Sequence, residues 1–317
     1  MRLLYITIAW ALLTASSYQR DQIKIVGSST LYPLVTIAAE HFARKYNYKT
    51  PIVESIGTGA GMKLFCGGND IKYPDIANAS RKIKATESDL CEKNQVKNFD
   101  EIILGFDGVI IARSVKGVDF ALNSKSLFLA LAKYIIFDDK MVENPYDYWD
   151  EIDPDFDHIK IEVFGPAYGS GTRDVLTDLV AEQCLKQSKM TELYPNLADR
   201  KIFCSWIRED GRYVESGEND NIIISKIIQN PKALGVISFN YLRSNSLKIN
   251  AIALDGAFPT VKTIISGKYK LSRPLYLYFN KEHYKTVAHL EDFVREIQTK
   301  GYIGPDGILT KNGLISK

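Results

Sequence analysis

The sequence predicts an α/β protein, and two observations lead to that prediction. Short apolar strands alternate along the chain with stretches of helical periodicity. Several of these strands run into a loop rich in glycine and hydroxyl residues, and a helix follows each loop. In open α/β sheets, the loops beyond the carboxyl ends of the strands converge on a ligand crevice. We therefore expect an α/β fold with a polar binding cleft.

The most informative loop is Gly165–Asp174, which lies between a predicted strand at Ile159–Phe164 and a predicted helix that includes Val175–Glu182. The first N–H groups of a helix have no partner within it, and the helix dipole leaves positive charge there. The loop also offers hydroxyl and guanidinium donors, and its glycines allow the backbone to approach a ligand closely. These features suit an oxyanion of phosphate size. The alternative is an ordinary helix start with Ser or Thr as its cap.

Composition sets limits on the class of protein. The chain has 317 residues, which is enough for two domains, with 45% hydrophobic and 25% charged residues, as in soluble globular proteins. Its formal net charge is +2 and no block of Lys or Arg is present, so we expect no nucleic-acid partner.

The first residues have the pattern of a secretory signal peptide. A basic start at Met1-Arg2 precedes an apolar run from Leu3 to Leu13, and Ala15-Ser16-Ser17 then supplies small residues. The run is too short to be a good membrane span. We predict a signal peptide at 1–17, cleaved after Ser17, and an exported mature protein. An uncleaved N-terminal anchor is the alternative.

The four cysteines fit an exported protein. An even number of cysteines outside the cytoplasm suggests disulfides, and the sequence allows three pairings. We favour Cys66–Cys91 and Cys184–Cys204, because both close short local loops. A zinc site is less favoured, since neither a CxxC spacing nor a nearby His pair is present.

The first third of the chain repeats the unit of strand, polar loop and helix. The first two predicted strands each lead into a loop rich in glycine and in residues with hydroxyl groups. The third ends on a serine and an arginine. We predict strands at Gln22–Val26, Thr50–Ser55 and Asp75–Arg81, and helices at Leu34–Ala43, from Met62 to Phe65 and at Lys84–Glu92.

The rest of the chain predicts a second domain and a return to the first. The apolar stretch Glu101–Ala112 is a candidate crossing strand, and the chain is expected to pass between the domains more than once. Pro274 within a predicted strand indicates an edge or a bulge. Asn219 or Asp220 is expected to cap the helix that follows, with a role in the site as the alternative. We further predict helices at Ser126–Lys133, Ile222–Ile228 and Leu290–Lys300, strands at Gly235–Phe239 and Leu271–Phe279, and a surface loop with a short helix at Asp138–Asp155.

The order and spacing of these loops resemble those of the periplasmic phosphate-binding proteins, the PstS-type receptors of phosphate ABC transporters. The resemblance runs from about residue 22 to the C-terminal helix. It rests on the segments Gly27–Pro33, Gly57–Gly61, Asp75–Arg81, Gly169–Arg173, Glu218–Asn221 and Ser272–Tyr276.

The resemblance implies a type II periplasmic binding fold with phosphate held between two α/β domains. It implies a monomeric, periplasmic protein without a cofactor or a metal that delivers phosphate to the permease subunits of an ABC transporter. The domains would comprise 18–104 plus 246–317 and 105–245. The phosphate ligands would be Ser29, Thr30, Leu31 (through its N–H), Thr58, Ser80, Arg81, Ser170, Gly171, Thr172 and Arg173.

The sequence departs from the best-known branch of the family in one place. In that branch an Asp near the position of Ser80 accepts the phosphate proton, whereas this chain has Ser80-Arg81, as in a second branch. The acceptor is therefore open, with Asp220 and Glu215 as candidates. We nevertheless expect phosphate to be preferred over sulfate, because a buried acceptor would meet a proton on phosphate and none on sulfate.

The sequence leaves three alternatives to a phosphate receptor. An enzyme is disfavoured, because G-x-S-x-G is absent around Ser170 and all four His residues lie outside the loops. A receptor for sulfate, molybdate or tungstate would use the same donors. An adhesin or envelope protein can share this fold without transporting anything.

Overall fold

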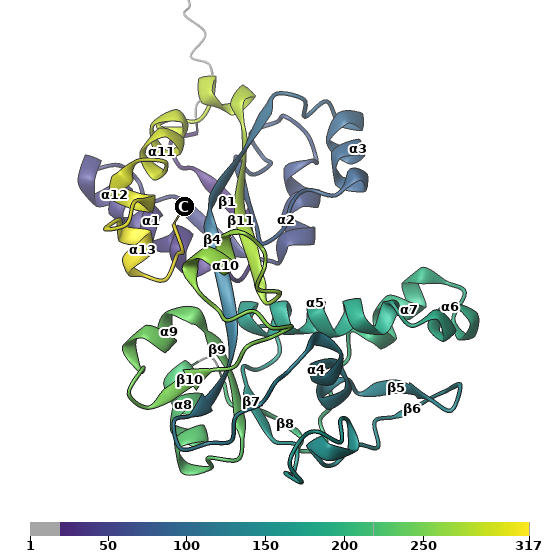
Figure 1. Ribbon diagram of the computed structural model, residues 1–317. Coiled ribbons are helices and arrows are strands. Elements are labelled where there is room, and N and C mark those ends of the chain that lie inside the picture. Colours follow the sequence, from purple (N-terminus) through teal and green to yellow (C-terminus); the bar gives the residue numbers. More distant parts are fainter. Residues whose placement is uncertain (1–19, 218, 317) are drawn as a thin grey trace, which may run out of the picture.

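The structure is a computed structural model that describes residues 20–217 and 219–316. Two lobes lie one above the other, with a long strand running through both (Figure 1). The predicted signal peptide at 1–17 lies outside the described residues.

The first lobe contains the three predicted units of strand and helix. The strands pair in the order β2-β1-β3-β11-β4, with β1 parallel to both β2 and β3. Because the three strands are parallel, the loops at their carboxyl ends gather at one edge of the sheet. The elements are β1 (Lys24–Gly27), α1 (Tyr32–Tyr46), β2 (Ile52–Ser55), α2 (Thr58–Phe65), β3 (Ile76–Ala79) and α3 (Ala85–Lys93), as predicted apart from their ends.

The crossing strand is confirmed as β4 (Phe99–Ser114), which has 16 residues. Its first part pairs with β11 (Ser272–Asn280) in the upper lobe, and its second part pairs with β9 (Leu234–Ser238) in the lower lobe (Figure 1). Pro274 lies on β11, an inner strand, directly before a register shift at Leu275/Tyr276. Of the two alternatives for Pro274, the structure therefore has the bulge.

The second lobe completes the sheet in the order β4-β9-β7-β8. The helices α6 and α7 and the β5–β6 hairpin project to one side of it (Figure 1). Its elements are α4 (Ser124–Leu131), β5 (Tyr134–Phe137), β6 (Lys140–Glu143), the 3-10 helix η1 (Trp149–Glu151), β7 (Val163–Gly165), α5 (Gly171–Leu185), α6 (Ser188–Leu193), α7 (Leu197–Cys204), β8 (Tyr213–Glu215), α8 (Asp220–Gln229), α9 (Phe239–Ser244) and β10 (Ile249–Ala251).

One prediction in this lobe was wrong in part. The segment Asp138–Asp155 contains the short helix that we expected, but it also contains β6 and the fully buried Trp149. Its acidic residues suggested a surface loop, whereas Trp149 packs against Phe120 and Phe156 in the core. The contacts of a single large ring therefore outweighed the polar composition of the segment.

The C-terminal part of the chain returns to the first lobe. The ring of Phe293 packs edge-on against Phe42 of α1, with ring centroids 5.2 Å apart. The elements of this return are the 3-10 helix η2 (Lys281–Lys285), α11 (Leu290–Ile297), α12 (Lys300–Ile303) and α13 (Ile308–Lys311). The helix α10 (Val261–Ile265) precedes the return, and its Ile264 packs with residues of the second lobe. The predicted helix at Leu290–Lys300 is α11 with the start of α12.

Each lobe buries its own hydrophobic clusters. One cluster runs from Phe106 to Leu271 with Ile315, and two others hold the residues of the first lobe. Ile249, Leu254 and Tyr269 belong to the cluster of the second lobe, and β10 pairs with β4 there. The division at 104/105 and 245/246 stays a prediction, and we propose that the return to the first lobe occurs near Ser272.

Both disulfides have the favoured pairing. Cys66–Cys91 joins the end of α2 to α3, and Cys184–Cys204 joins α5 to α7. The first bond ties α2, which begins at Thr58, to α3, which begins shortly after Arg81, so it supports two of the predicted loops.

Candidate functional site

Three helices begin directly after strands of the sheet, and their first turns are not capped by side chains. Leu31, Gly57 and Ser170 are the N-cap residues of α1, α2 and α5, and none makes a side-chain cap hydrogen bond. Among the described residues, side chains do cap four α-helices and one 3-10 helix: Asn123 caps α4, Asn196 caps α7, Asn219 caps α8, Thr260 caps α10 and Asn280 caps η2. The Gly165–Asp174 loop therefore does not form the simple Ser or Thr cap that was its alternative interpretation. Asn219 caps α8, as expected.

A cleft of about 210 Å³ lies where the two lobes meet. Five of the predicted ligands line it, two from the loop after β1 and three from the start of α5: Ser29, Thr30, Ser170, Gly171 and Thr172. Asp107 of β4, Ser238 and Asn240 also line it. The structure therefore brings together loops that lie about half the chain apart in the sequence.

The two loops approach each other very closely. A Cβ atom added to Gly171 would lie 2.0 Å from Thr30 Oγ1 and 2.7 Å from Thr30 Cα. No side chain fits at such distances without a shift of the backbone, so position 171 requires glycine in this arrangement. On the other side of the cleft, Thr172 Oγ1 lies 3.3 Å from Ser238 Oγ.

Thr58 and Ser80 form a second hydroxyl pair in the first lobe. Their side-chain oxygens are 3.1 Å apart, and the N–H of Ser80 donates to Thr58 Oγ1 over 3.2 Å. The carboxyl ends of β2 and β3 thus hold these two predicted ligands together, although neither lines the cleft pocket. Leu31 has a fully buried side chain, so only its backbone could meet a ligand.

Arg81 is held by an acidic neighbour. Its guanidinium donates to both oxygens of Glu87, over 2.9 and 2.7 Å, and Glu87 also accepts from the N–H of Lys84. Burial alone would raise the pKa of Glu87, but these donors outweigh it and lower the pKa below its ordinary value. Arg81 remains close to the second loop, since a Cβ on Gly59 would lie 3.8 Å from its Nη2.

Arg173 does not line the cleft pocket. Its guanidinium donates to the carbonyl of Pro166 over 3.2 Å and to Glu215 over 3.3 Å, and it lies 4.2 Å from the ring centre of Tyr213. It is 6% exposed and lines a separate pocket of about 480 Å³ that also contains Trp206. Burial raises the pKa of the neighbouring Tyr213 to about 12. We had not predicted these partners.

Arg273 contacts both lobes, although it is not among the site residues predicted from the sequence. Its Nη2 donates to Thr30 Oγ1 over 2.7 Å and to the carbonyl of Gly171 over 2.6 Å. Its Nε lies 3.5 Å from Asp107 Oδ2. In the sequence, Arg273 is marked only by its place in the segment Ser272–Tyr276, one of those that resemble the phosphate-binding proteins. The resemblance gave this arginine no role.

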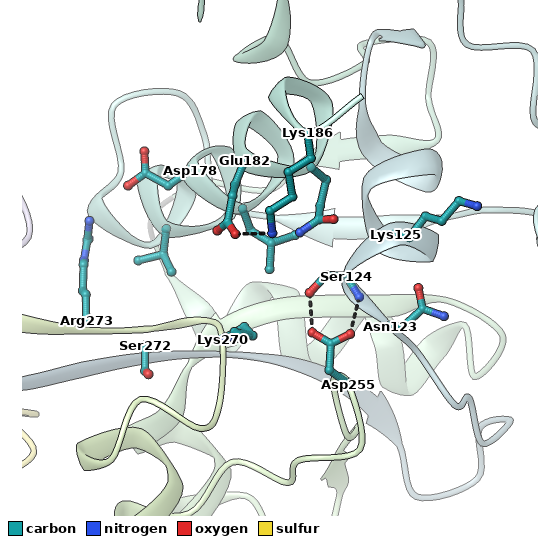
Figure 2. A pocket seen from close by; sticks show the side chains of 13 residues that line it. Asn123, Ser124, Lys125, Asp178, Glu182, Lys186, Asp255, Lys270, Ser272 and Arg273 are labelled. Carbon is teal, nitrogen blue, oxygen red and sulfur yellow. Dashed lines mark hydrogen bonds and ion pairs between the residues drawn. The ribbon is translucent and has the colours of Figure 1, made fainter. Parts of the chain in front are cut away.

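Arg273 also lines a second, larger pocket of about 580 Å³. Figure 2 shows Arg273 and Asp178 at the same end of this pocket. The carboxylate of Asp255 accepts hydrogen bonds from the N–H of Ser124, over 2.9 Å, and from the hydroxyl of Ser124. Lys186 forms an ion pair with Glu182. The side chain of Asp178 is exposed to solvent, but the protein around it partly desolvates its carboxyl group and raises its pKa, against the opposing effect of Arg273, Lys84 and Arg81.

The two suggested proton acceptors lie outside the cleft pocket. Asp220 accepts from the N–H of Ser238 over 2.9 Å and is 5% exposed. Glu215 accepts from Arg173 and from the N–H of Tyr168, over 3.3 and 3.2 Å. Asp107 is the carboxylate that does line the pocket.

Comparison with known proteins identifies the superfamily. The model of the PBP superfamily domain matches residues 14–300, which is most of the chain. The chain therefore belongs to the PBP (periplasmic binding protein) superfamily. It is 29% identical to the protein SphX of Synechocystis over 88% of this chain and 74% of the relative. It is 26% identical to the phosphate-binding protein PstS of Staphylococcus saprophyticus, over 90% of this chain and 78% of that protein.

Solved structures of this superfamily have the same fold. A structure from Planctomyces limnophilus, described as a possible phosphate-binding protein, matches with a TM-score of 0.72 and 24% identity over 93% of this chain and 92% of that one. An ABC-type phosphate transport receptor from Vibrio cholerae matches with a TM-score of 0.65 and 19% identity, over 93% and 100%. The expected type II periplasmic binding fold is thus confirmed.

No helix within 20–217 and 219–316 is long and apolar enough to cross a membrane. In the same part of the chain, no three His, Cys, Asp or Glu side chains are grouped as a metal site would require.

Proposed function

We propose that this protein captures inorganic phosphate in the cleft between its lobes and delivers it to the membrane permease of an ABC transporter. The observation that carries the proposal is the convergence of Ser29 and Thr30 with Ser170, Gly171 and Thr172 at helix starts that no side chain caps. Uncapped helix N-termini with nearby hydroxyls bind phosphate-like anions. The names of the relatives, PstS and a phosphate transport receptor, support the same ligand.

The finer parts of the proposal come from the sequence. The mature protein is a periplasmic monomer without catalytic activity, released by cleavage after Ser17, and it belongs to the branch with Ser80-Arg81 in the third loop. Thr58, Ser80, Arg81 and the N–H of Leu31 complete the site in the first lobe. Arg173 supports the α5 loop from behind, where its bonds to Pro166 and Glu215 favour a positioning role.

Phosphate binding acts by closing the lobes about β4 and β11. A ligand favours the closed form only through contacts that the open form lacks, and loops from both lobes supply such contacts here. Phosphate is then held without its hydration shell. Small-angle scattering is expected to show compaction when phosphate is added to the ligand-free protein.

Calorimetric titration of the mature protein with phosphate, sulfate, molybdate and tungstate tests the proposal. Phosphate is expected to bind with the highest affinity. Equal affinity for sulfate would leave a general oxyanion receptor, and no heat with any of the four anions would refute the receptor function. A phosphatase assay on the same preparation separates a receptor from a hydrolase.

A further inference from the structure

After α13 the chain contacts both lobes within two residues. Leu314 is 2% exposed and packs in a hydrophobic cluster of the first lobe, whereas Ile315 is 5% exposed and packs in the cluster of the second lobe. The N–H of Ile315 donates to the carbonyl of Phe106 on β4 over 3.0 Å, and the N–H of Phe106 donates to the carbonyl of Ile315 over 2.8 Å. The segment 313–316, here called the C-terminal strap, therefore lies across the hinge where β4 passes between the lobes.

The strap lies on the edge of β4 that faces away from β11. A residue in an antiparallel pair directs its N–H and its carbonyl to the same side, and Phe106 gives both to the strap. Further along β4 the same edge is occupied by β9, whose Ser238 is paired with Val109. Since α9 begins directly after β9, the strap lies beside the first turn of that helix.

Asn240 in this first turn holds the strap from the second lobe. Its Nδ2 donates to the carbonyl of Gly313 over 2.6 Å. Gly313 has a φ of +115°, a conformation that favours glycine, and a Cβ added there would lie 2.6 Å from the same Nδ2. The strap therefore receives the amide of Asn240 in this way only with glycine at position 313. Both residues also line the cleft pocket.

We propose that Asn240 and Gly313 form a latch that favours the closed arrangement of the lobes and so strengthens phosphate binding and slows phosphate release. This inference rests on the proposed function. The pair of Phe106 and Ile315 lies on the hinge strand itself, so it can persist when the lobes rotate. Asn240 lies beyond the hinge on a helix of the second lobe, so its bond to the strap is expected only when the lobes are close together.

A latch of this kind acts through the equilibrium between open and closed lobes. A contact made only in the closed form shifts that equilibrium with or without a ligand, and the apparent affinity for a ligand rises with the fraction of the competent form. Asn240 is thus a positioning residue that affects binding without having to contact the anion. Asn312 lines the same pocket, but its Nδ2 donates to the carbonyl of Ile308 within the first lobe over 2.7 Å, so it does not join the lobes.

The test compares the full mature protein with Asn240→Ala. Asn240 is exposed, so the variant is expected to fold as the parent does. Without phosphate, small-angle scattering should show a more extended average shape in the variant. With phosphate, calorimetry should show an affinity about threefold to tenfold lower, and stopped-flow measurements should show faster dissociation with unchanged association. Identical scattering of the two ligand-free proteins, or an unchanged affinity, would overturn the inference.

Gly313→Ala breaks the same contact from the side of the strap. If one latch is responsible, the double variant Asn240→Ala/Gly313→Ala should bind phosphate no more weakly than the weaker of the two single variants. Losses of affinity that add up would mean that the two residues act separately, for example through a direct contact between Asn240 and phosphate, and would also overturn the inference.

Asn245→Ala is the matched control. Asn245 is the C-cap of the same helix, and its Nδ2 donates to the carbonyl of Tyr241 within that helix over 3.0 Å. This variant should keep the scattering and the affinity of the parent, and changes as large as those of Asn240→Ala would assign the effect to α9 instead of the latch. A parent protein that binds no phosphate would refute the proposed function, whereas the scattering of the ligand-free proteins would still decide for or against the latch.

Discussion

The guanidinium of Arg273 donates a hydrogen bond to the hydroxyl of Thr30 over 2.7 Å. The same nitrogen donates to the carbonyl of Gly171 over 2.6 Å, so one side chain from β11 contacts a binding loop from each lobe. Because β11 pairs with β4 along the connection between the lobes, this contact joins the hinge region to the site. Arg273 is thus the residue at which closure and ligand binding are expected to be coupled.

Replacing Arg273 is therefore expected to weaken phosphate binding. Arg273→Ala should cost about 2–5 kcal/mol of binding free energy, because a buried charge partner is lost from the closed cleft. Arg273→Lys should cost about 1–3 kcal/mol, since an ammonium group does not reproduce the planar set of donors. Calorimetry with phosphate measures both values.

An exposed arginine provides the control for this series. The side chain of Arg295 is 71% exposed and pairs with Glu291 on α11, so Arg295→Lys should leave the phosphate affinity unchanged. An Arg273→Lys variant that binds phosphate as tightly as the parent would contradict the role given to Arg273.

Gly171→Ala is expected to keep the lobes apart. The new Cβ would meet Thr30 Oγ1 at 2.0 Å and Thr30 Cα at 2.7 Å, so the two loops could not approach as they do now. We expect phosphate binding to weaken by about 1–3 kcal/mol, as for other overpacked sites. Small-angle scattering should show less compaction on adding phosphate than in the parent.

Gly59→Ala is the matched control, because it also adds a methyl group to a predicted binding loop. The nearest atom to its new Cβ would be Arg81 Nη2 at 3.8 Å, an ordinary contact. Alanine also favours the helical conformation of α2. Phosphate affinity should therefore equal that of the parent; if both glycine variants behave alike, steric contact with Thr30 is not the cause.

Local patterns explain which parts of the fold could be predicted. A strongly apolar stretch indicated that Glu101–Ala112 is a crossing strand, and the structure has β4 at Phe99–Ser114. The spacing of the cysteines favoured the two bonds that form. These features depend on residues close together in the chain, where periodicity and loop length are informative.

Partners of the site residues depend on pairings that no local pattern contains. Arg273 and Thr30 are 243 residues apart, and their contact requires both the register of β11 on β4 and the approach of the lobes. Arg173 meets Glu215 from 42 residues away, so the sequence could suggest an anion-binding arginine but not its acidic partner. No local pattern marks Asp107 as a cleft residue either, because it lies within an apolar stretch of the sequence.

The two disulfides are expected to differ in their effect on binding. Replacing either pair with serine should cost about 2–4 kcal/mol of stability, because each bond restricts the unfolded chain. Loss of Cys66–Cys91 should also weaken phosphate binding, since it joins the end of α2, a helix of only 8 residues that begins at Thr58, to α3, which follows Arg81. Loss of Cys184–Cys204 should leave binding unchanged, because that bond lies at the far end of α5 from Ser170.

Thermal unfolding and phosphate titration of the two double variants check these expectations. If the two double variants lose the same amount of phosphate affinity, the loss follows from their lower stability and not from the position of either disulfide. Unchanged affinity in Cys66→Ser/Cys91→Ser would show that the disulfide does not support the loops of the first lobe.

The Arg81–Glu87 pair gives a pH dependence of stability whose sign follows from the pKa of Glu87. The ordinary pKa of a glutamate is 4.5, and folding lowers the pKa of Glu87 below this value. The folded state therefore binds the proton less readily than the unfolded state does. The contribution of Glu87 is fully present above about pH 4.5 and is lost as the pH falls through the lower, folded pKa.

Glu87→Gln should consequently be less stable than the parent at pH 7, and the difference should shrink as the solution is acidified below pH 4.5. Urea unfolding of the parent and of Glu87→Gln at several pH values measures this difference in the free energy of unfolding. Glu291→Gln, in an exposed pair with Arg295, is the control and should change stability by less than about 0.5 kcal/mol at every pH. A difference between Glu87→Gln and the parent that stays constant down to the acid limit would mean that the charge of Glu87 is not what stabilises this loop. In that case the lowered pKa could not be attributed to Arg81, and Arg81 would be freer to meet an anion than the structure indicates.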